Sequence, residues 1–143
     1  MKILPPPTND QYQGAVWAVI PLALVALQTL IGGTLHVLLP DSGLISIAGL
    51  DLAHDGGLQM IAMAARLGAT QMVWGLVLAL IVLRHRNFTL LFLCLAIVEK
   101  GLLLLGRAIK PTGAEHMPLG FYGAMILLVL CVIAIYGARA KSE

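Results

Sequence analysis

Charged side chains are scarce in this sequence. Asp, Glu, Lys and Arg make up 11% of its 143 residues, whereas the apolar set AVILMFWYC makes up 59%. A typical soluble domain is about 25% charged and roughly 45–50% apolar. So little polar surface excludes a water-soluble fold and predicts an integral membrane protein. Because nine Lys and Arg nearly balance seven Asp and Glu, the composition also excludes a nucleic-acid binder.

Cysteine is rare as well, since the sequence has only Cys94 and Cys131. They form no C-x-x-C pair, which argues against a disulfide-exchange membrane enzyme, and a buried cysteine usually serves packing. The sequence also has no recognisable Ser/His/Asp set, phosphate loop or nucleotide-binding fingerprint. We therefore expect no catalytic residue set and no cofactor, and a non-enzymatic function is the favoured hypothesis.

Long apolar segments are what the sequence has in abundance. A bilayer core of about 30 Å is crossed by ~20 helical residues, and helices satisfy their own backbone hydrogen bonds in hydrocarbon. The sequence therefore predicts an all-α, single-domain four-helix membrane bundle over residues 1–143. The expected spans are residues 14–39, 58–83, 87–109 and 119–137. The first is longer than the apolar stretch of a signal peptide, and we expect it to be retained.

The basic residues outside these spans fall mostly on one side of the expected membrane. That side holds Lys2, Arg84, Arg86, Arg139 and Lys141, and the other holds Lys110 beside Asp41, Asp51, Asp55 and Glu115. The positive-inside rule therefore predicts that both termini and the Arg84–Asn87 turn are cytoplasmic.

The connections between the spans differ in kind. The Arg84–Asn87 turn is so short that the second and third spans are expected to be antiparallel neighbours. The outer connection Pro40–Gly57 is long and half apolar, and we expect a short helix on the membrane surface or a cap folded back over the bundle. The Pro5–Pro7 run is a stiff leader with no evident partner.

Small residues predict where the helices approach one another, because lipid tails provide no hydrophobic drive between them. The first span has Gly32-Gly33, the second Ala64 and Gly68, and the fourth Gly120 and Ala124. All lie in the outer half of their spans. We therefore expect tight packing there, with the bulky inner halves facing lipid or partner subunits.

Four polar residues are expected near the middle of the membrane. At about 1.5 Å per residue, Gln28, Gln71, Glu99 and Lys100 all lie about 18–21 Å from the inner surface. Gln28 and Gln71 are natural partners at this height. The functional interpretation is an intramembrane ligand-binding or proton-handling site. The alternative is a buried polar cluster that fixes the register of the helices.

Glu99 is the residue on which we expect any activity to depend most. A charge near the bilayer centre costs at least ~2.5–3.5 kcal/mol, so a carboxylate there needs partners or water. We therefore expect Glu99 to face inward. Adjacent positions lie about 100° apart around a helix, so Glu99 and Lys100 are not expected to form a facing pair.

A second polar layer lies about 27–33 Å from the inner surface. His36, Arg66, Arg107 and Tyr122 are expected to form an outer cationic pocket suited to an anionic lipid headgroup or a small carboxylate. Both arginines can instead extend to the interface, and we favour this for Arg107 and a packed polar role for Arg66. The nearby His54, Asp55, Glu115 and His116 match no metal-binding spacing, so we expect no metal site.

Several short motifs occur in a familiar order. Arg66-Leu67-Gly68 is followed by GLVLAL, by the RHR turn and by Gly106-Arg107 before a short outer loop. This order, over about residues 58–137, resembles the DoxX-like families and other small four-helix proteins of the bacterial inner membrane. The resemblance implies a four-helix bundle and no settled activity, because members range from redox-complex subunits to proteins of unknown role. The Glu99-Lys100 pair and the long first outer loop have no counterpart in that pattern.

Three functions fit these features, in the following order. The first is a non-enzymatic bundle that binds a lipid or another hydrophobic ligand, or that serves as a subunit of a membrane complex. The second is an oligomeric small transporter or channel with Glu99 as the coupling residue. The third is an intramembrane enzyme acting on a quinone, sterol or isoprenoid, with Glu99 as acid/base assisted by His36 or Tyr122. The long Leu, Val and Ile faces also predict a homo-oligomer or a larger complex surrounded by membrane lipids.

Overall fold

The computed structural model describes residues 3–110 and 117–139, and within these ranges the chain is all α-helical, with no strand. The basic residues Lys2 and Lys141 and the outer residues Glu115 and His116 lie outside the described ranges. The four helices are α1 (Val19–Leu38), α2 (Gly57–Arg84), α3 (Thr89–Ile109) and α4 (Leu119–Ala138). Three short 3₁₀ turns accompany them, η1 (Asn9–Gln11), η2 (Val16–Ala18) and η3 (Arg86–Phe88).

Each of the four helices is long and apolar enough to cross a membrane, as expected of a multi-pass membrane protein. The membrane-length stretches are Val16–Leu38, Gly57–Arg84, Arg86–Ile109 and Leu119–Ala138. The predicted helix number and positions are therefore confirmed, with bounds that differ by one or two residues.

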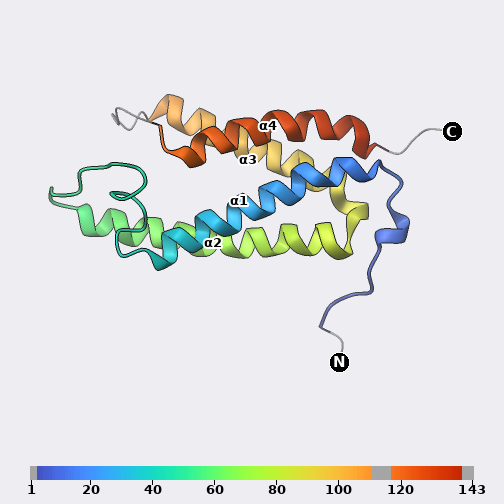
Figure 1. Ribbon diagram of the computed structural model, residues 1–143, viewed down its shortest axis with the longest axis horizontal. Helices are drawn as coiled ribbons and strands as arrows, with labels where there is room; N and C mark the ends of the chain where they lie inside the picture. The colour runs from blue at the N-terminus through green and yellow to red at the C-terminus, as the bar shows by residue number, and fades with distance from the viewer. Residues whose placement is uncertain (1–2, 111–116, 140–143) are drawn as a thin grey trace.

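The helices run along the long axis of the molecule, and α1 is central (Figure 1). It packs along α2, its most extensive neighbour, and also contacts α4 and α3. One end, here called the turn end, carries the α2–α3 turn, the start of α1 and the end of α4. The opposite end, called the loop end, carries residues 39–56 and the start of α4.

Helices α2 and α3 run in opposite directions, as predicted from their short connection, but they contact each other only slightly. The reason is α1, which packs against α2 along one side and against α4 and α3 along the other. The short turn therefore fixes the direction of α3 without making it a packing neighbour of α2.

The buried core lies toward the turn end. The fully buried large side chains of α1, α2 and α3 there include Leu22, Val25, Leu78 and Leu93. Helix α4 completes this core with Leu127, Cys131, Ala134 and Ala138. The expectation that the bulky inner halves face only lipid or partner subunits is wrong, because in this half α1 is surrounded by the other three helices.

The predicted close approach of small residues is confirmed between α1 and α2. A Cβ added to Gly33 would lie 2.7 Å from the carbonyl oxygen of Gly68, and one added to Gly68 would lie 2.8 Å from the carbonyl oxygen of Gly33. The two backbones meet so closely that only glycine fits. Gly120 behaves differently, since a Cβ added there would have no neighbour within 4 Å.

The outer connection folds back on the ends of α1 and α2. Asp41 accepts hydrogen bonds from the backbone N–H groups of Gly43 (2.9 Å), Ile45 (3.0 Å) and Ser46 (2.6 Å). These bonds stabilise the carboxylate and lower the pKa of Asp41 to about 2. The buried hydroxyl of Ser42 donates to the carbonyl oxygen of Ile61 on α2 at 3.1 Å. Of the two predicted alternatives, the structure therefore has the folded-back segment, held against the α1–α2 pair.

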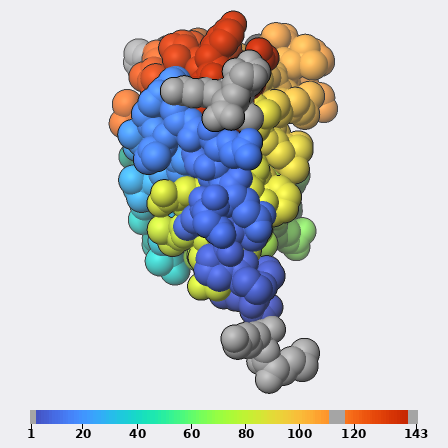
Figure 2. Space-filling view, turned by 90° about the vertical axis from the view of Figure 1, so that its right-hand side faces the viewer, coloured from blue at the N-terminus to red at the C-terminus, as the bar shows by residue number. Residues whose placement is uncertain are grey.

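Residues 3–15, here called the N-terminal strap, lie across the α2–α3 turn (Figures 1 and 2). The Thr8 N–H donates to the carbonyl oxygen of Arg84 at 2.8 Å, and the Asn9 side-chain amide donates to that of Leu83 at 2.8 Å. In return, the Arg84 guanidinium donates to the carbonyl oxygen of Pro5 at 3.3 Å. The proline-rich leader thus has a partner, which corrects the expectation from sequence.

Candidate functional site

The middle of α3 carries an ion pair. The Lys100 side chain is 7% exposed, and its Nζ lies 2.8 Å from Oε2 of Glu99, whose side chain is 44% exposed. Both residues stand in a helix otherwise dominated by leucine, so this pair is the main concentration of charge in that span.

The orientation of this pair differs from the prediction in two ways. Lys100, rather than Glu99, points into the bundle, because it follows Leu93 and Ala96 on the buried face of α3. Glu99 lies at the edge of that face and is exposed. The two side chains also meet although they are adjacent in sequence, since the long lysine stem lets the ammonium group reach the neighbouring carboxylate.

The two glutamines predicted at the same depth have different partners. Gln28 Nε2 donates to the carbonyl oxygen of Gly120 at 3.0 Å and thereby links α1 to α4. Gln28 Oε1 is buried and has no hydrogen-bond partner within the described ranges. Gln71 Oε1 instead lies against Gly32, 3.6 Å from where a Cβ of that residue would be. Among the described residues no hydrogen bond joins Gln28 to Gln71, so the predicted pair does not form.

The outer polar residues also have separate environments. His36 Nδ1 donates to the carbonyl oxygen of Ser42 at 2.7 Å, and because a carbonyl only accepts, Nδ1 carries the proton. The Arg107 guanidinium carbon lies 5.1 Å from the centre of the Phe121 ring, whereas Arg66 and Tyr122 are exposed. The predicted packed role of Arg66 is therefore wrong, whereas the extension of Arg107 to the interface stays a prediction. No hydrogen bond or ion pair between described residues assembles these four into the expected pocket.

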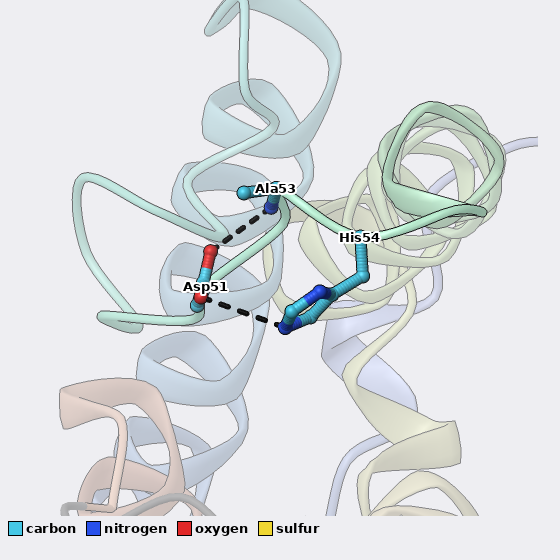
Figure 3. A network of polar contacts seen from close by, with 3 residues as sticks. All are labelled: Asp51, Ala53 and His54. Carbon is cyan, nitrogen blue, oxygen red and sulfur yellow. Dashed lines mark hydrogen bonds and ion pairs between the residues drawn. The ribbon is translucent and has the colours of Figure 1, made fainter.

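The histidine and acidic residues of the outer connection form an exposed turn (Figure 3). Asp51 accepts from the Ala53 N–H at 2.9 Å, and its other carboxylate oxygen lies 3.7 Å from Nε2 of His54. Both side chains are largely exposed. Within residues 3–110 and 117–139, no group of three or more His, Cys, Asp or Glu side chains is placed to hold a metal ion.

A buried polar cluster at the turn end was missed from the sequence. Thr8 Oγ1 donates to Oδ1 of Asn87 and lies 3.2 Å from Nδ1 of His85, which therefore donates to it. His85 is buried, and its Nε2 and the hydroxyl of the buried Thr89 have no partner among the described residues. The basic RHR run gave no sign of this cluster, because its partner Thr8 is distant in sequence.

A cavity of about 210 Å³ lies beside this cluster, between the strap, the start of α3 and the end of α4. Burial raises the pKa of Tyr12, one of its lining residues, and the positive charge of Arg86 partly opposes that shift. The lining residues are Gln11, Tyr12, Gln13, Gly14, Asn87, Leu90 and Ala138.

Comparisons of this chain with protein-family models, curated proteins and solved structures found no match. The DoxX-like resemblance therefore stays a prediction, and the interpretation of function depends on the geometry alone.

Proposed function

We propose that the protein is a small, non-enzymatic subunit of a membrane complex or homo-oligomer, and that it associates through the Glu99 face of α3. The observation that carries this proposal is the position of the Glu99 carboxylate, 44% exposed in the middle of a membrane-length helix. A carboxylate facing lipid at this depth is costly, and a neighbouring transmembrane helix can cover it and provide hydrogen bonds.

The residues that share this face favour a helix as the covering partner. Leu95 and Leu102 lie one turn on either side of Glu99 and are exposed. Gly106 follows one further turn along, and a Cβ added there would have no neighbour within 4 Å. A small residue beside a polar one is the combination that lets two transmembrane helices approach and hydrogen-bond.

Binding of a lipid or another hydrophobic ligand is the second candidate function. In the described part of the chain only Oε2 of Glu99 has a partner, so Oε1 is available to accept a hydrogen bond from a ligand hydroxyl. A transporter or channel with Glu99 as coupling residue also requires association, since Glu99 lies on the outside of a single chain.

In the proposed orientation the protein spans a bacterial inner membrane with its turn end on the cytoplasmic side. Arg84, Arg86 and Arg139 lie at that end, outside or at the ends of the spans, whereas Lys110 lies at the loop end. This distribution supports cytoplasmic termini by the positive-inside rule.

Cysteine cross-linking in lipid nanodiscs or native membranes tests the proposed association. In a Cys94→Ser/Cys131→Ala background, Leu102→Cys places a thiol on the Glu99 face, and Ile126→Cys places one at the matching depth on α4. The two native side chains are 60% and 62% exposed. We expect a disulfide-linked dimer from Leu102→Cys and little from Ile126→Cys. Equal yields, or a larger yield at Ile126, would contradict the proposal.

A paired substitution separates association from stability. Glu99→Gln/Lys100→Met removes both charges, and replacing a buried ion pair by residues of similar volume is often neutral for folding. We expect light scattering in mild detergent to give an oligomer mass for the wild type. The variant is expected to fold but to give the mass of a monomer. A variant that keeps its oligomer mass would exclude the Glu99 face, and a lipid retained by the wild type alone would favour the second candidate.

A further inference from the structure

The cavity at the turn end lies where the membrane spans end. Leu90 belongs to the first turn of α3 and Ala138 to the last turn of α4. The opposite wall is the strap around Tyr12, which precedes the first span. In a bilayer this position corresponds to the headgroup region, where one side of the cavity is apolar and the other is wet.

The polar lining of the cavity consists mainly of side-chain amides, since the Tyr12 hydroxyl already donates to the carbonyl oxygen of Ala15 at 3.0 Å. Gln11 and Gln13 are exposed and provide side-chain amide groups. Asn87 Oδ1 already accepts from Thr8, and its Nδ2 has no hydrogen-bond partner among the described residues. Among residues 3–110 and 117–139 no carboxylate lines the cavity, although Asp10 precedes Gln11 and is exposed. This lining suits an acceptor-rich group such as a phosphate.

One arginine, Arg86, provides positive charge beside the cavity. Arg86 uses Nε to bond the carbonyl oxygen of Val82 at 3.0 Å, and within the described ranges its two Nη groups have no hydrogen-bond partner. Its charge acts on the lining residue Tyr12. Arg139 directly follows Ala138, but its guanidinium carbon lies 5.6 Å from the centre of the ring of Tyr136, which does not line the cavity and points to the other side of α4 from Ala138. An arginine beside an aromatic ring at a span end is common at the membrane interface.

We propose that this cavity binds the phosphodiester headgroup of an anionic membrane lipid. The amides of Gln11, Gln13 and Asn87 donate to the phosphate oxygens, and Arg86 neutralises the charge. Leu90, exposed beside the polar wall, contacts the first part of the acyl chain. The site lies at the turn end, away from the Glu99–Lys100 pair at mid-span, so it does not depend on the proposed association.

Native mass spectrometry with added phosphatidylglycerol or phosphatidylcholine tests the charge part of the proposal. We expect the wild type to retain phosphatidylglycerol preferentially. Arg86→Gln is expected to weaken that preference about five-fold, the effect of one basic residue near a lipid surface. Arg86→Lys keeps the charge and should retain most of the preference. The matched control is Lys110→Gln, which removes one charge at the loop end and should change nothing.

A second pair of variants tests the cavity itself. Leu90→Trp fills the cavity without changing charge, whereas Leu91→Trp adds the same side chain at the next, exposed position of α3. Loss of phosphatidylglycerol in the first variant alone supports the site. Equal loss in Lys110→Gln and Arg86→Gln, or equal binding in both Trp variants, would overturn it. Displacement of the lipid by low-millimolar inorganic phosphate would assign the cavity to free phosphate and overturn the lipid proposal.

Discussion

Gly33 and Gly68 show how single residues set the spacing of α1 and α2. The two backbones meet at a distance that leaves no room for a Cβ on either residue. In a membrane such contact replaces the hydrophobic drive that brings helices together in water. The contact could be predicted from the sequence because glycines in the same half of two successive spans indicate a close approach of the helices.

Gly68→Ala is therefore expected to destabilise the protein by about 1–3 kcal/mol, as overpacking does in a close contact. The new Cβ would lie 2.5 Å from the Cβ of His36 as well as near the backbone of Gly33. Unfolding in mixed detergent micelles measures the effect. Gly101→Ala is the control, because open space surrounds that position, and an equal loss of stability there would contradict the explanation.

The orientation of Glu99 and Lys100 illustrates what single residues do not reveal. Their position near the middle of α3 was predictable, because the length of the apolar segment sets where the helix begins and ends. Their direction depends on how α3 is rotated about its axis, which is decided by its packing on α4 and α1. Leucine occupies most neighbouring positions of α3, so no apolar stripe in the sequence distinguished the face of Lys100 from that of Glu99.

At the scale of elements, the outer connection is held by one carboxylate. The Asp41 carboxylate accepts hydrogen bonds from three backbone N–H groups at the start of the turns over residues 41–48. The sequence predicted that this segment is partly apolar and left its conformation open. The positive φ of Ser42 and its bond to Ile61 depend on contacts with α2 that are not local in the chain.

The bonds of Asp41 predict an acid-dependent loss of stability. The pKa of Asp41 is about 2 in the folded protein, against 3.8 for the free side chain. Because the folded value is the lower one, the contribution is present above about pH 4 and is lost as the pH falls toward 2. Asp41→Asn should therefore be less stable than the wild type near neutral pH, and the difference should shrink between pH 4 and 2.

Thermal unfolding of both proteins in a detergent that is insensitive to pH measures this difference. Asp55→Asn, in an exposed part of the same connection, is the control for a lost charge. A difference in unfolding temperature between the wild type and Asp41→Asn that stays constant down to pH 2 would refute the explanation.

At the scale of the whole molecule, the number and bounds of the helices were predictable from the length and apolarity of each segment. Their arrangement was not, because four similar apolar helices can pack in several orders. The central position of α1 depends on its contacts with all three other helices. The N-terminal strap was missed because its partners are distant in sequence. Arg84 lies at the end of the second span, and Gly137 lies near the end of the fourth.

The proposed orientation predicts which end of the molecule a membrane-impermeant thiol reagent reaches. Ser42 is buried, so a cysteine placed there would not report on accessibility. Ala53 and Asp10 are exposed at the loop end and the turn end. In a Cys94→Ser/Cys131→Ala background, we expect labelling of Ala53→Cys from the periplasmic side and of Asp10→Cys only after the inner membrane is opened. The reverse pattern would invert the topology.

The strap also sets an order for assembly during synthesis. Thr8 and Ala15 leave the ribosome before any of the four spans, yet their backbone N–H groups bond to the carbonyl oxygens of Arg84 and Gly137. The first of these acceptors is made only after two spans, and the second after all four. The strap therefore docks fully only after the fourth span has been made, and its docking marks the completion of the four-helix bundle.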